Sequence, residues 1–133
     1  MRTPLLQTIL VAYDDPTSET LGRAADLAAA LGARLIVTNV AAPVESAEAE
    51  NAKGYASERL EQARNFIAPR TLDAEFVSSV GPPADAIVRL AEERDVDLIV
   101  VGTRKKGFFE RLVEGSVNQD VLRRAPCDVL VVH

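Results

Sequence analysis

The sequence predicts an α/β protein, namely a three-layer α/β/α sandwich around a five-stranded parallel sheet. Five short segments rich in β-branched residues alternate with four longer segments whose apolar residues recur every three or four positions. Three of the short segments are almost continuously apolar, which is typical of parallel strands covered by helices on both faces. The length of 133 residues fits a single domain, residues 1–133, with one core.

The third predicted strand differs from the other four. Ser78 and Ser79 interrupt its apolar residues, and Glu75 precedes it, a mixture that suits an edge strand better than a central one. The predicted strands are Ile9–Tyr13, Leu35–Val40, Phe76–Val80, Leu98–Val101 and Val129–Val132.

The first two predicted helices are bounded by proline and glycine. Pro16, Thr17 and Ser18 supply the start of the first helix, and Gly32 is a natural end for it. The second helix is expected from about Ala47 to Ile67, because Pro69 cannot continue it. The apolar positions of the first helix are Leu21, Ala24, Ala25, Ala28 and Leu31.

The other two predicted helices follow the third and fourth strands. One opens near Pro83, where the missing N–H of proline costs nothing, and is expected to bury Ile87, Leu90 and Ala91. The last begins around Ser116 and stops before Pro126. It is expected to place Val117, Val121 and Leu122 on one face.

The order of the strands predicts where a ligand would bind. Crossovers between parallel strands are right-handed almost without exception, so with the third strand at an edge the spatial order is 3-2-1-4-5, a Rossmann-like arrangement. The winding then reverses between the first and fourth strands, and a ligand crevice is expected at their carboxyl ends. Asp14 and Asp15 border it on one side and residues 102–106 on the other.

Charge and composition exclude several classes of protein. A net charge of −5 argues against a surface that grips nucleic acid or an anionic membrane. One cysteine, Cys127, and one histidine, His133, allow neither an internal disulfide nor a Cys/His metal cluster. The apolar run before Asp14 is too short and too interrupted for a membrane span or a signal peptide. We therefore expect a cytoplasmic protein without membrane insertion.

The segment after the fourth strand has the features of a phosphate-binding loop. Glycines let the backbone approach a phosphate, and a helix N-terminus offers free N–H groups to an anion. Residues 102–124 contain six basic and three acidic residues, which makes this region positive on an acidic chain. The alternative is that the loop only turns the chain and that solvent covers its cations. The glycines concerned are Gly102, Gly107 and Gly115, and Ser116 adds a hydroxyl.

Motifs along the chain resemble those of the universal stress protein family. They are Ile9–Asp14, then Gly81-Pro82, then Asp97–Gly102, and finally Gly115-Ser116 followed by Ala125–Val132. The resemblance covers essentially the whole chain and is most specific in its last thirty or so residues. It implies an adenine-nucleotide-hydrolase-like fold and a small stress-response protein that binds ATP.

The resemblance also implies the residues of the ATP site. The family's nucleotide-binding branch has the pattern G-x2-G-x9-G-[ST], in which the backbone and the serine hold the phosphates. Asp14 would lie by the ribose, Val40 by the adenine, and the remaining residues by the phosphates. These are Gly102, Thr103, Arg104, Lys105, Gly115, Ser116, Val117 and Asn118.

One residue departs from the family pattern. Lys105 stands where the second glycine of the motif is expected, and Gly107 comes two residues late. Either the lysine reaches a phosphate, or its side chain keeps the backbone away from the ligand. The family also contains a branch that lacks the glycines and does not bind ATP. The alternative function is therefore a dimeric stress-response interaction protein that binds no nucleotide.

Other families and catalysis receive little support from the sequence. A response-regulator receiver would need an acceptor aspartate after the third strand, where this chain has Gly81. A flavodoxin would need a hydroxyl-rich loop after the first strand, and a dinucleotide-binding protein a glycine fingerprint there. Cys127 suits packing better than nucleophilic attack. We expect binding rather than catalysis, although Asp14 and Asp15 could hold Mg²⁺ beside ATP and permit slow hydrolysis.

A homodimer is the expected assembly. The predicted sheet order leaves the fifth strand, Val129–Val132, as an apolar edge. A second copy of the same strand, related by a twofold axis, would pair with the N–H and C=O groups of that edge. The resemblance implies the same, because members of the family commonly pair in this way.

Overall fold

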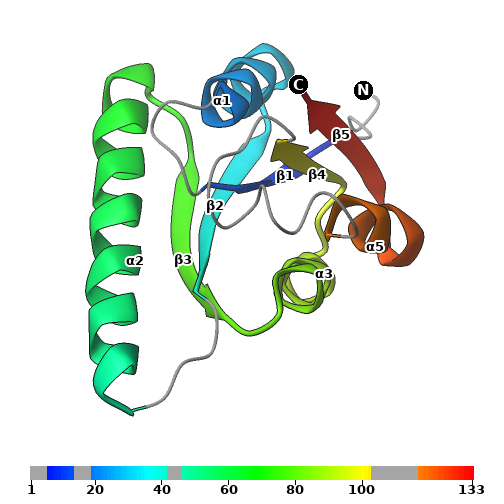
Figure 1. The fold of residues 1–133 in the computed structure, drawn as a ribbon. Coiled ribbons are helices and arrows are strands. Elements are labelled where there is room, and N and C mark those ends of the chain that lie inside the picture. The colour runs from blue at the N-terminus through cyan, green and yellow to red at the C-terminus, as the bar shows by residue number, and fades with distance from the viewer. Residues whose placement is uncertain (1–5, 14–18, 42–45, 103–116) are drawn as a thin grey trace.

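The computed structural model describes residues 6–13, 19–41, 46–102 and 117–133, and strands and helices alternate along these residues (Figure 1). The first half contains β1 (Thr8–Ala12), α1 (Thr20–Leu31), β2 (Arg34–Ala41), α2 (Ser46–Ile67) and a short 3-10 helix, η1 (Ala68–Arg70). The second half contains β3 (Ala74–Val80), α3 (Pro83–Glu93), β4 (Leu98–Gly102), α5 (Val117–Arg124) and β5 (Asp128–Val132).

The five strands form one parallel sheet in the order β3-β2-β1-β4-β5. Ile9 of β1 pairs with Leu35 of β2 and with Leu98 of β4, so β1 is the central strand. The predicted fold class, strand order and edge position of the third strand are therefore confirmed. The observed strands extend the predicted ones by one or two residues at most of their ends.

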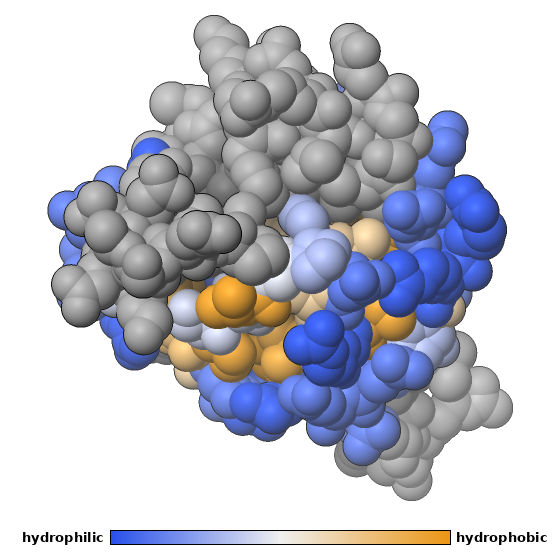
Figure 2. Space-filling view, turned by 60° about the horizontal axis from the view of Figure 1, so that its bottom comes forward, coloured by the Kyte–Doolittle hydropathy of each residue, from blue (hydrophilic) through white to orange (hydrophobic). Residues whose placement is uncertain are grey.

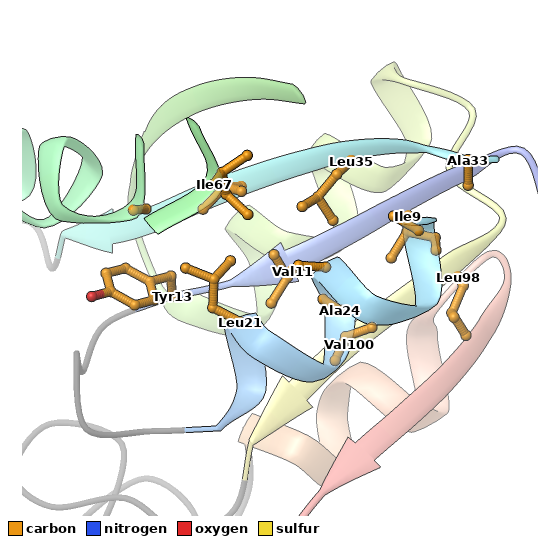
Figure 3. Packing of buried hydrophobic residues seen from close by; sticks show 14 of the residues in the cluster. Ile9, Val11, Tyr13, Leu21, Ala24, Ala33, Leu35, Ile67, Leu98 and Val100 are labelled. Atoms are coloured by element: carbon orange, nitrogen blue, oxygen red, sulfur yellow. The ribbon is translucent and has the colours of Figure 1, made fainter. Parts of the chain in front are cut away.

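Helices cover the sheet on both faces and divide the core into two clusters. α1 and α2 lie on one face, where Val11, Leu35 and Val100 meet Leu21 and other apolar helix residues (Figure 3). α3 and α5 lie on the other face (Figure 1). The fully buried residues of that second cluster include Leu10, Ile36, Ile87, Ile99 and Val121.

Some details of the helices differ from the predictions. Leu122 is 54% exposed although its neighbour Val121 is completely buried, because consecutive helical residues point about 100° apart. Leu31, at the end of α1, is 38% exposed rather than buried. The cap of α1 is Glu19, without a side-chain capping hydrogen bond, and the predicted starting residues 16–18 lie outside the described part.

The ends of α1 and α2 follow from backbone chemistry. Gly32 adopts a left-handed conformation (φ 65°), and the N–H of Ala33 after it donates to the carbonyl of Ala28. Glycine adopts this conformation without strain, which is why α1 stops there as predicted. α2 ends at Ile67 and continues as η1, which contains Pro69.

Part of the hydrophobic surface reaches solvent. Figure 2 shows hydrophobic residues gathered in the middle of one face and bordered by hydrophilic ones. Val80, the last residue of β3, is 56% exposed. Within the described part of the chain, no helix is both long enough and apolar enough to cross a membrane.

Candidate functional site

The carboxyl ends of β1 and β4 form the point where the direction of winding reverses. From β1 the chain passes to β2 and β3 on one side, and it then crosses to β4 and β5 on the other side (Figure 1). The predicted switch point between the first and fourth strands is thus present. In open α/β sheets, ligands bind in the crevice outside such a pair of strand ends.

The structure describes only part of the predicted site. Val40 is buried near the end of β2 and packs in the cluster that faces α3 and α5. Gly102 is the last residue of β4 and pairs with Val132 of β5. Val117 and Asn118 form the first turn of α5, of which only the backbone is described. The remaining predicted residues, Asp14, Thr103, Arg104, Lys105, Gly115 and Ser116, lie outside the described residues.

Gly102 makes room for α1. A Cβ atom at this position would overlap Oγ1 of Thr20, the first residue of the helix. Thr20 is 5% exposed, so its side chain is enclosed at this contact. A Cβ atom at position 102 would therefore force the enclosed side chain of Thr20 to shift, whether or not a ligand also approaches there. Thr20 was not predicted, because a small polar side chain at the start of a helix is common in sequences and does not by itself indicate a close contact.

The end of β1 is held through the backbone of Tyr13. The N–H of Tyr13 donates to the carbonyl of Thr38 (2.8 Å), and its own carbonyl accepts a hydrogen bond from Nδ2 of Asn39 (2.7 Å). The Tyr13 hydroxyl lies 3.5 Å from Oε1 of Gln62 on α2. These contacts fix the last described residue before Asp14. Asn39 was not predicted, although an asparagine inside the apolar segment Leu35–Val40 is unusual enough to draw notice.

The end of β2 is also tied to β3. Oγ1 of Thr38 donates to the carbonyl of Val77 (2.7 Å) and lies 2.7 Å from the hydroxyl of Ser79. Thr38 is completely buried and Asn39 is 2% exposed. Buried polar groups cost free energy unless they are hydrogen-bonded, so these neutral contacts stabilise the three strand ends together.

Two of the basic residues counted in residues 102–124 form ion pairs away from the predicted phosphate contacts. Arg123 forms an ion pair with Asp120 (3.5 Å), and Arg124 forms one with Asp85 on α3. Both arginines lie in the last turn of α5, whereas the predicted phosphate contacts are at its first turn. The expected positive charge therefore rests on the basic residues between Gly102 and Ser116.

Cys127 has the properties of a packing residue. It is half-buried and packs against the cluster that faces α3 and α5. Burial is the main cause that raises the pKa of its thiol, and the carboxylates of Asp128 and Asp97 raise it further. A thiol that stays protonated is a weak nucleophile. In the part of the chain that is described, no three His, Cys, Asp or Glu side chains group as metal ligands would.

A depression of about 670 Å³ lies at the opposite end of the sheet. Its lining includes Leu6, Arg34, Arg70 and Asp73, which belong to the amino-terminal approaches of the strands. Both guanidinium groups are already paired, Arg34 with Glu75 and Arg70 with Asp26. This depression is therefore a poorer candidate for a phosphate ligand than the carboxyl ends of β1 and β4.

Comparison with known proteins decides the family. The model of the universal stress protein family matches residues 6–133. The chain belongs to this family. A universal stress protein of Thermus aquaticus is 38% identical over 140 residues, which cover 97% of this chain and 100% of that protein.

Solved structures of universal stress proteins have the same fold. One, determined in complex with cAMP, is 34% identical, with a TM-score of 0.76 and coverage of 98% of this chain and 99% of that one. Another, from Archaeoglobus fulgidus in complex with dAMP, is 27% identical, with a TM-score of 0.74 and coverage of 98% and 100%. The ligands in both complexes are adenine nucleotides.

Proposed function

We propose that this universal stress protein binds an adenine nucleotide, ATP in particular, in the crevice at the carboxyl ends of β1 and β4. The observation that carries the proposal is the reversal of winding between these two strands. The related proteins with cAMP and dAMP support the choice of an adenine nucleotide. The proposed role is binding, with a change of partner affinity or assembly in response to nucleotide, rather than turnover.

Each predicted site residue receives a place in this proposal. Asp14 contacts the ribose and Val40 contacts the adenine. The phosphates lie against the backbone of the segment that begins at Gly102 and against the start of α5, where N–H groups and the helix dipole favour an anion. The residues proposed at the phosphates are Gly102, Thr103, Arg104, Lys105, Gly115, Ser116, Val117 and Asn118. Mg²⁺ would accompany the triphosphate, with Asp14 and Asp15, which follow β1 in the sequence, as its acidic ligands.

Calorimetric titration with ATP and adenosine tests the site. We expect micromolar affinity for ATP, which corresponds to about −8 kcal/mol. Gly115→Val should abolish ATP binding, because the branched side chain enters the path of the phosphates. The absorbance spectrum of the purified protein offers an earlier indication, since with no Trp and two Tyr a co-purified nucleotide would dominate it. Equal ATP affinity for parent and Gly115→Val would show that the placement is wrong.

Lys105 separates this proposal from the alternative, a dimeric interaction protein that binds no nucleotide. If its ammonium pairs with a phosphate oxygen, Lys105→Ala weakens ATP roughly tenfold and leaves adenosine unchanged. Arg123→Ala is the matched control, because this cation is paired with Asp120 in the last turn of α5. A parent that binds neither ligand, together with a Lys105→Gly variant that binds ATP, would establish the alternative.

We also propose a homodimer formed through β5. This strand is at an edge of the sheet, with Val129 and Val131 packed toward α3 and α5 and with Leu130 39% exposed on the other face. A second copy of β5 across a twofold axis would extend the sheet and cover Leu130. Light scattering at tens of micromolar should give the dimer mass. Leu130→Lys should lower the measured mass toward that of the monomer, whereas the control variant Leu122→Lys on α5 should keep the dimer mass. A parent with the mass of a monomer would reject the dimer.

A further inference from the structure

Asn39 stands out among the buried polar residues of the sheet. It is 2% exposed, between the buried residues Thr38 and Val40, and asparagine is depleted in strands. Its Nδ2 donates to the carbonyl oxygen of Tyr13 at 2.7 Å, in a contact that is buried from solvent. An amide kept in such a place is stable only while it is hydrogen-bonded.

The hydrogen bond lies where the β1–β2 ladder ends. The last paired residues are Ala12 and Thr38, and one further backbone hydrogen bond joins the N–H of Tyr13 to Thr38. Beyond that point the side chain of Asn39 supplies the donor for the carbonyl of Tyr13, the residue after β1. Both backbone polar groups of Tyr13 are thus fixed to β2. The next residue in the sequence is Asp14, the proposed ribose contact.

We infer that Asn39 is a positioning residue of the nucleotide site: its buried amide holds the backbone of Tyr13, the residue before Asp14, in a fixed position. This inference rests on the proposed function. Asn39 also immediately precedes Val40, the proposed adenine contact, so one residue joins the two strand ends that hold the nucleoside. Binding is strongest when the contacting groups are held in place before the ligand arrives, because less ordering remains to be done.

The neighbouring residue Thr38 provides a matched control. Its side chain is equally buried, and its hydroxyl contacts the carbonyl of Val77 and the hydroxyl of Ser79. These contacts join β2 to β3, on the other side of β2 from β1. Thr38→Val therefore removes the hydrogen bonds of a buried side chain on the same strand, while the carbonyl of Thr38 still accepts the N–H of Tyr13. A merely structural role for Asn39 predicts that both variants change nucleotide binding in proportion to their loss of stability.

The experiment compares Asn39→Leu and Thr38→Val with the parent. We expect Asn39→Leu to weaken ATP and adenosine roughly tenfold or more, whereas Thr38→Val stays within about twofold of the parent. In the nucleotide-free proteins, amide hydrogen exchange at Tyr13 should be faster in Asn39→Leu and unchanged in Thr38→Val. If Asn39→Leu fails to fold, Asn39→Ser, whose hydroxyl is too short to reach the carbonyl, replaces it in both measurements.

The outcomes distinguish this inference from the proposed function. A parent that binds ATP and an Asn39 variant that binds it equally well would overturn the inference alone. Equal losses of affinity in the Asn39 and Thr38 variants would also overturn it, since the effect would then be a general loosening of the strand ends. A parent that binds no adenine nucleotide would overturn the proposed function, and this inference with it.

Discussion

Among the residues that the structure describes, side-chain contacts between elements at the amino ends of the strands involve charged groups, whereas those at the carboxyl ends of β1, β2 and β3 involve neutral ones. Oδ2 of Asp97 accepts hydrogen bonds from the N–H groups of Gln7 (2.9 Å) and Thr8 (3.0 Å). Glu75 pairs with Arg34 (3.0 Å) and Arg94 (2.9 Å). The corresponding contacts at the other end are those of Asn39 and Thr38.

The difference matters for a site that is proposed to take a polyanion. A carboxylate fixed beside the phosphates without an intervening cation would repel them, and an extra ion pair would compete for the cations of the loop. Hydrogen bonds of the Asn39 and Thr38 type hold the strand ends without adding charge. At the amino ends, where solvent screens the ion pairs, charged contacts can fix the strands without affecting a ligand at the carboxyl ends.

The largest effect is expected at Gly102. A methyl group there overlaps Oγ1 of Thr20, so Gly102→Ala should lower the free energy of unfolding by about 1 to 3 kcal/mol, as overpacking of a close contact does. Urea unfolding of the parent and variant measures the change. Thr20→Ala removes the overlapping oxygen, and in that background the cost of Gly102→Ala should be much smaller.

The Thr20→Ala, Gly102→Ala double variant also tests whether ATP binding needs the glycine. If Gly102 serves only the packing of α1, the Thr20→Ala, Gly102→Ala protein should bind ATP as the Thr20→Ala protein does. If the phosphates also need the glycine, stability recovers while ATP affinity does not. A Gly102→Ala variant as stable as the parent would contradict the packing role.

A smaller effect is expected at Asp97. Asp97→Ala leaves the N–H groups of Gln7 and Thr8 without their acceptor and should cost about 1 kcal/mol of unfolding free energy, because one of these contacts is only partly buried and the other is exposed. Asp97→Asn keeps a side-chain oxygen and is the control. Because Asp97 lies at the amino ends, ATP affinity should not change in either variant. A loss of affinity matching that of the Asn39 variant would break the distinction between the two ends.

The fold was predictable because its signals are local. The apolar runs of β1, β4 and β5, together with Gly32 and Pro83 at helix boundaries, define the elements, and right-handed crossovers then leave few topologies. The polar residues of β3 correctly predicted an edge strand. Leu122 was misjudged because a leucine next to the buried Val121 satisfies the apolar pattern although it points elsewhere.

The contacts that shape the candidate site were less predictable. Thr20 meets Gly102 across about eighty residues of sequence, and Asn39 meets Tyr13 across two elements of the fold. Such contacts depend on how strands and helices pack in space, which no periodicity along the chain records. The pairing of Arg124 with Asp85 on another helix is a further contact of this kind.

The smallest effect concerns Glu75 and its dependence on pH. The hydrogen bond from Arg94 is the main cause that lowers the pKa of this carboxyl group. Burial, the next largest cause, opposes it, and the charges of Arg94 and Arg34 lower the pKa further. Because the pKa is lower in the folded protein, the contribution of Glu75 to stability is fully present above the ordinary glutamate pKa of about 4.3. It is lost as the pH falls from that value through the lowered pKa.

Urea unfolding of the parent and Glu75→Gln between neutral and acid pH checks this sign. We expect the parent to be slightly more stable at neutral pH, by less than a buried pair would contribute because the carboxylate is partly exposed, and the difference to shrink as the pH falls below about 4. Arg94→Gln removes the main cause, so in that background the difference should depend less on pH. A difference that instead grew as the pH fell would mean that Glu75 does not bind its arginines in solution, and the charged character of the amino ends would then rest on Asp97 and on the Asp26–Arg70 pair.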